Sequence, residues 1–117
     1  MKSMLIAAAI TLLPLVKDKL EGPWETKPSE KGNVTRVVFK PDNTFEGFVN
    51  RKPFVTGKYA FKDDVLSFTD NGCDGNQGVY KAVFFSNEDS LKFECIFDLC
   101  TERKEGMIRT ILGRIKK

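Results

Sequence analysis

The chain has 117 residues, of which 41% are hydrophobic and 30% charged, and this is typical of a single folded domain with one core. The net charge of +3 is spread along the chain, which argues against a nucleic-acid-binding protein. The sequence contains no histidine, so this chain alone cannot supply a Ser-His-Asp triad, a histidine general base or a His-ligated metal site. We therefore expect no catalytic residue, no cofactor and no bound metal.

Residues 1–16 form an apolar segment with a basic start. Lys2 precedes the run SMLIAAAITLLPLV, and the chain turns polar at Lys17. An apolar run of roughly 13 residues fits a secretory signal peptide and is shorter than the ~20 residues of a membrane-spanning helix. No small-x-small cleavage triplet stands before Lys17, so an uncleaved apolar helix is the alternative. We expect a secreted or periplasmic protein without a membrane span.

Residues 20–117 are expected to form one all-β domain. Short runs rich in Phe, Val, Tyr and Ile alternate with turn residues, as in antiparallel strands joined by hairpins. The expected strands cover about 23–26, 33–40, 44–49, 54–61, 65–69, 78–85, 90–99 and 107–115, with a charged link over 101–106. Eight sequential strands close most economically into a small up-and-down barrel, because closure removes exposed sheet edges. A two-sheet β-sandwich is the alternative.

The alternation of side chains along each strand indicates which residues face the interior. In 91–99, for example, the odd-numbered residues share one apolar face, whereas Asp98 lies on the other. An eight-stranded barrel is either filled by side chains or holds one small ligand. If a ligand is held, the candidate lining residues are the inward aromatics Phe39, Phe45, Tyr59, Phe61, Phe68, Tyr80, Phe93 and Phe97.

The stretch TDNGCDGNQGVY, residues 69–80, is similar in composition to an EF-hand calcium loop. Counting from Asp70, however, position three is Gly72 and position twelve is Lys81, so one ligand is missing and a cation replaces the bidentate glutamate. The stretch is better interpreted as a glycine-rich connection between two strands. Cys73 in this loop and Cys100 at a strand end are both free to meet, so of the three possible pairs we expect this disulfide.

Several motifs together resemble the lipocalin-like, or calycin-type, small barrels of exported bacterial proteins. They are GPW at 22–24, FKPDNTF at 39–45, GKYAF at 57–61, GVY at 78–80 and FDLCTER at 97–103. The resemblance implies a barrel in which Trp24 closes one end beneath a late arginine, with Arg103 the first choice and Arg114 the second. Asp98 lies close in sequence to Cys100 and Arg103, so it is either a functional carboxylate or a strand-end aspartate that pairs with an arginine or accepts hydrogen bonds from loop amides.

Two functional hypotheses follow. The first is a non-catalytic carrier that binds one small hydrophobic ligand inside the barrel, and the resemblance favours it. The second is a protein-interaction or structural module with a filled core and no small-molecule ligand. The sequence does not indicate an oligomeric state.

Overall fold

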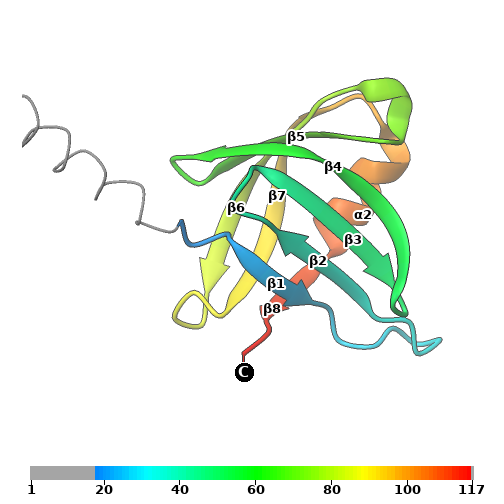
Figure 1. The fold of residues 1–117 in the computed structure, drawn as a ribbon, viewed down its shortest axis with the longest axis vertical. Helices are drawn as coiled ribbons and strands as arrows, with labels where there is room; N and C mark the ends of the chain where they lie inside the picture. Colours follow the sequence, from blue (N-terminus) through cyan, green and yellow to red (C-terminus); the bar gives the residue numbers. More distant parts are fainter. Residues whose placement is uncertain (1–17, 117) are drawn as a thin grey trace, which may run out of the picture.

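The protein is a closed antiparallel barrel of eight strands (Figure 1). The computed structural model describes residues 18–116, so the expected signal peptide or apolar helix over 1–16 lies outside the described residues. Each strand pairs with its neighbours in sequence, and the last pairs with the first. The strands are β1 Gly22–Glu25, β2 Thr35–Phe39, β3 Thr44–Val49, β4 Lys52–Lys62, β5 Val65–Asp70, β6 Gly78–Phe85, β7 Ser90–Asp98 and β8 Ile111–Arg114.

This architecture confirms the expected up-and-down barrel and excludes the two-sheet sandwich. Buried and more exposed residues alternate along the strands, so one apolar face of each strand turns inward. Tight hairpins join the strands: Asp63 and Asp64, for instance, form the β4–β5 turn and both have positive φ, as a type I′ hairpin turn requires. Neither helix found in residues 18–116 is long and apolar enough to cross a membrane.

A helix replaces part of the expected last strand. We expected a charged link over 101–106 followed by a strand over 107–115, but α2 covers Thr101–Arg109 and β8 only Ile111–Arg114. The charged residues favour a helix, and Met107 on its inner side packs against the core. Because β8 is short, it pairs with β7 only over residues 90–92, and α2 contacts β7 as well.

A β-bulge in β7 reverses the inside and outside of its last residues. Tyr80 of β6 pairs with Cys95 and Val79 pairs with Phe97, so Ile96 has no partner in the ladder. An extra residue of this kind shifts the alternation by one position. The expected inward position of Phe97 is therefore wrong: its side chain is on the outside and 52% exposed. The same shift turns Asp98 inward.

Trp24 closes one end of the barrel, and the arginine above it is Arg114. The indole is fully buried, its Nε1 donates to the carbonyl of Leu20 at 2.8 Å, and the Arg114 guanidinium lies 4.3 Å from the ring. Arg114 also donates to the carbonyls of Lys19 (2.8 Å), Glu88 (3.0 Å) and Glu21 (3.4 Å). The first choice, Arg103, was wrong because β8, and not the segment after β7, pairs with β1 at Trp24.

We expect Arg114→Ala to lower the free energy of unfolding by about 2–4 kcal/mol, because it removes a cation–π contact and several charge-assisted hydrogen bonds. Urea denaturation followed by Trp24 fluorescence measures this. The matched control is Arg36→Ala, whose exposed ion pair with Glu25 spans 3.4 Å and should contribute less than about 1 kcal/mol. Equal losses in the two variants would contradict the role of Arg114.

Candidate functional site

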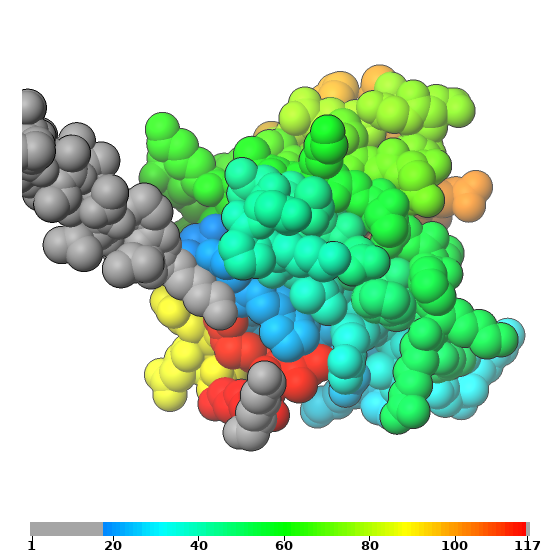
Figure 2. Space-filling model, in the orientation of Figure 1, coloured from blue at the N-terminus to red at the C-terminus, as the bar shows by residue number. Residues whose placement is uncertain are grey.

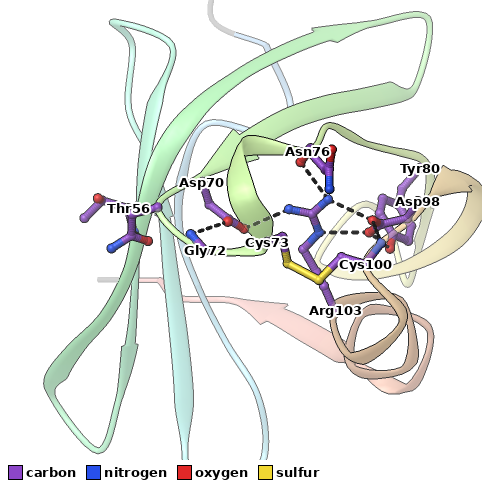
Figure 3. Close-up of polar contacts among 10 residues, drawn as sticks. Thr56, Asp70, Gly72, Cys73, Asn76, Tyr80, Asp98, Cys100 and Arg103 are labelled. Atoms are coloured by element: carbon purple, nitrogen blue, oxygen red, sulfur yellow. Dashed lines mark hydrogen bonds and ion pairs between the residues drawn. A yellow bond between two sulfur atoms is a disulfide. The ribbon is translucent and has the colours of Figure 1, made fainter.

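A buried carboxylate, Asp98, is the centre of a polar cluster at the other end of the barrel (Figure 3). Its side chain is 0% exposed. It accepts hydrogen bonds from the Tyr80 hydroxyl at 2.5 Å, from Arg103 Nε at 2.9 Å and Nη2 at 2.8 Å, and from the Cys100 N–H at 2.9 Å. The bulge in β7 is what brings Asp98 to this inward position. Both carboxylate oxygens are thus occupied by donors from this chain.

Arg103, on the first turn of α2, connects Asp98 to the β5–β6 loop. Its Nη1 donates to Asp70 at 3.2 Å and its Nη2 to the carbonyl of Asn76 at 2.9 Å. The guanidinium lies 4.9 Å from the centre of the Phe68 ring. Only 10% of its side chain is exposed, so these contacts are largely shielded from water. Arg103 therefore covers this end of the barrel much as Arg114 covers the end at Trp24.

The loop 71–77 is held by turn chemistry and by a disulfide. Asp70 accepts the N–H of Gly72 at 2.8 Å, which is an Asx-type turn. Cys73, in the short 3-10 helix η2 Cys73–Gly75, is bonded to Cys100 at the start of α2, so the expected disulfide is confirmed. Asp70 thus pairs with Arg103 and shapes the turn, and the third cysteine, Cys95, is free.

A glycine makes the close packing of this cluster possible. A Cβ atom at Gly78, the first residue of β6, would lie 3.1 Å from Asp98 Oδ2 and 3.2 Å from Arg103 Nη2. These distances are shorter than ordinary van der Waals contacts, so a larger residue would push the ion pair apart. The glycine of the GVY motif therefore leaves room for the buried charges.

The surroundings of these groups shift their pKa values in opposite directions. Burial alone would raise the pKa of Asp98, but the hydrogen bonds from Arg103, Tyr80 and the Cys100 N–H outweigh it and lower the pKa to about 2. Burial and the hydrogen bond to Asp98 raise the pKa of Tyr80 well above its usual range. The hydrogen bond to Asp98 likewise raises the pKa of Arg103. Over the physiological range the cluster thus holds an ionised carboxylate, a guanidinium and a neutral phenol.

The candidate lining residues, apart from Phe97, lie inside the barrel and pack on one another. Six of them are buried, and Phe61 is half-buried against the core. Their ring centroids are 5.1–6.4 Å apart along one continuous series, Tyr59, Phe39, Phe45, Phe68, Tyr80 and Phe93. A second series, Trp24, Phe84 and Phe61, has spacings of 6.2 Å. These distances are those of direct aromatic contact, so each ring of the two series packs against its neighbour.

A groove of about 360 Å3 lies near the Trp24 end of the barrel. Most of the residues that line it are charged: Lys19, Asp64, Lys81, Glu88 and Glu94 accompany Ala82, Val83 and Phe84. Lys19 spans it, with an ion pair to Asp64 at 3.0 Å and its ammonium 4.5 Å from the Phe84 ring. The eight aromatic residues expected to line a ligand site do not border this groove, which is polar where the carrier hypothesis needs an apolar wall.

Sequence reasoning did not identify three residues that help to close the Arg103 end and the Trp24 end of the barrel. Asp70 was considered only as a calcium ligand, yet it continues the inward alternation of Leu66 and Phe68, and this was the available signal. Leu20, fully buried below Trp24, precedes the first strand and had no periodic pattern to identify it. Lys19 lies in the turn that leads into β1, and its contacts with Asp64 and Phe84 are tertiary, so no local sequence motif identifies it.

Comparisons of the chain with protein-family models, with curated proteins and with solved structures found no match.

The pKa of Asp98 predicts a loss of stability in acid. Because its folded-state pKa of about 2 is below the unfolded value near 4, its contribution is complete above pH 4 and is lost as the pH falls toward 2. We expect the free energy of unfolding of the wild type to fall by roughly 2 kcal/mol more than that of Asp98→Asn between pH 4 and pH 2. Urea titrations at pH 5, 4, 3 and 2 measure the difference.

A carbon-13 NMR titration of the Asp98 carboxyl group checks the same point directly. The midpoint should lie near pH 2 in the wild type and move upward in Tyr80→Phe, which removes one donor. Parallel stability profiles together with an Asp98 midpoint near 4 would rule out the charged cluster as described.

The disulfide joins residues 27 apart in sequence, and a loop of this length predicts a stabilisation of about 3–4 kcal/mol. We expect Cys73→Ser combined with Cys100→Ser to lose about that amount, and the control Cys95→Ala to lose markedly less. Protein unfolded without reductant should show one reactive thiol per chain. Three reactive thiols in protein recovered from an oxidising compartment would contradict the pairing.

Proposed function

We propose that the chain is an exported, non-catalytic, lipocalin-like barrel that is filled by its own side chains and acts through its outer surface as a protein-interaction module. The observation that carries this proposal is the aromatic packing inside the barrel. The six buried aromatics of the candidate lining contact one another in series and are each at most 7% exposed. Drug-sized ligands occupy cavities of about 300 Å3 or more, and several of these rings would have to leave to make one.

The two ends of the barrel support the same proposal. Arg114 lies over Trp24 at one end, and Arg103 lies over Phe68 at the other, where it also pairs with Asp98. Opening either end would break a cation–π contact together with several charge-assisted hydrogen bonds, most of them partly buried. Where grey atoms do not cover them, residues of β1, β2 and β3 leave no deep hollow on the face shown in Figure 2.

Export is supported by the disulfide, because such bonds form and persist in oxidising compartments. A lipocalin-like relationship is supported by the closed eight-stranded barrel and by the Trp24–Arg114 contact, which the resemblance implied. An outward function is supported by large apolar side chains that remain exposed, including Phe54, Leu99 and Ile111. The carrier hypothesis is the alternative that the following experiment decides.

Native mass spectrometry of gently purified protein tests the filled interior. We expect the mass of the polypeptide with one disulfide and no copurifying molecule. We also expect no binding of benzene to the wild type, whereas Phe45→Ala, which removes a ring in contact with Phe39 and Phe68, should bind it in the cavity created. The variant shows that the measurement can detect a cavity. A stoichiometric copurifying lipid, or benzene binding by the wild type, would favour the carrier and overturn the proposal.

A further inference from the structure

We propose that an apolar surface on β7, α2 and β8 binds a second copy of this chain and makes a two-fold symmetric dimer. This inference rests on the proposed outward function and names the partner. The surface, called here the seam patch, consists of five side chains that are 50–68% exposed: Ile96, Phe97, Leu99, Ile108 and Ile111.

The seam patch is a consequence of the way in which the barrel closes. The bulge at Ile96 leaves two consecutive apolar side chains, those of Ile96 and Phe97, on the outside of β7. Beyond Lys92, β7 has no pairing with β8, and α2 also contacts β7. The helix starts just after Leu99 and ends just before Ile111, which lies opposite Lys92 across the β7–β8 ladder. The five side chains therefore come from β7, the turn that follows it, α2 and β8, and both α2 and β8 contact β7.

The size of the seam patch is within the range of apolar patches that are often functional. Five side chains of these types at the observed exposures present roughly 500 Å2 of apolar surface, near the upper end of the 300–600 Å2 of the largest patches on monomers. A standard interface needs about 800 Å2 from each partner. The exposed polar residues around the patch can supply the remainder as a rim.

The charges around the seam patch favour a second copy over other partners. Exposed residues of the same three elements carry both signs in equal number: Lys92, Lys104 and Arg109 are cationic, and Glu94, Glu102 and Glu105 are anionic. A partner of one sign, such as an acidic protein or an anionic membrane, would meet repulsion from half of these charges. A two-fold axis brings a surface against itself, so a rim with balanced charges can be complementary to its own copy.

Sedimentation equilibrium of the full chain between about 1 and 500 μM tests the dimer. We expect the wild-type mass to rise from one chain to two with concentration. Ile96→Lys should weaken dimerisation by roughly 30-fold or more, because it places a lysine in the centre of the apolar contact. The matched control is Phe54→Lys, which makes the same change at a 71% exposed aromatic on β4, away from the seam patch, and should dimerise like the wild type.

Thermal unfolding shows whether each variant is folded. If Ile96→Lys does not fold, Leu99→Glu, in the turn after β7, takes its place in the test. A wild type that stays monomeric throughout overturns the dimer, and so does equal weakening by Phe54→Lys. A monomer that binds vesicles containing phosphatidylglycerol also overturns it, in favour of a membrane. These outcomes leave the filled interior intact, whereas a copurifying ligand would overturn the proposed function itself.

Discussion

The closure of the barrel rests on a very short contact between its first and last strands. β1 and β8 pair at only two positions, Trp24 with Arg114 and Glu25 with Gly113. So short a ladder contributes few hydrogen bonds, and the side chains at the seam must stabilise it. Arg114 does this by covering the buried indole and by donating to carbonyl groups on the chain before β1 and on the β6–β7 hairpin. The termini of the described domain are thereby joined to the core.

Arg103 covers the opposite end of the barrel in the same way, by lying over an aromatic ring and joining separate segments through hydrogen bonds. Arg103 pairs with Asp70 and Asp98, and at most 7% of either aspartate side chain is exposed. A buried ion pair is costly unless its remaining donors and acceptors are satisfied. Here Tyr80, the Cys100 N–H and the Asn76 carbonyl satisfy them, and among the described residues no buried side-chain nitrogen or oxygen is left without a partner. The disulfide then fixes the loop and the helix that supply these groups.

Both ends enclose an interior that aromatic rings occupy. In a barrel of this length a large share of the core must come from a few bulky side chains, and the buried set is dominated by Phe, Tyr, Trp and Leu. Rings in direct contact stabilise the fold but leave little space for a ligand. Near the place where the barrel closes, α2 takes the place of the expected first part of β8, and apolar side chains such as Ile108 and Ile111 are exposed there. The apolar surface that is left for recognition is therefore on the outside of the barrel, as the proposed function requires.

Sequence periodicity predicted most of this fold because alternation with period two is a local property. It identified all eight strands, the turn at Asp63 and Asp64, and the aromatic interior. Periodicity failed where one extra residue shifts the alternation of inward and outward side chains. The bulge at Ile96 leaves no signal in an apolar run, yet this bulge turns Phe97 outward and Asp98 inward. The assignment of Arg114 to Trp24 depended on the β1–β8 register, which is long-range. The helix α2 was missed because its charged residues also suit a loop, and its only strong signal, Met107 packing inward, is tertiary.

The most direct test of the filled barrel is a crystal structure determined under xenon pressure. Xenon enters apolar cavities that are too small for most ligands and reports empty space without a change in sequence. We expect no xenon among the rings of Phe39, Phe45, Phe68 and Tyr80, with Arg103 and Arg114 in place over the two ends. Well-occupied xenon sites among these rings, or density for an elongated apolar molecule there, would contradict a filled interior.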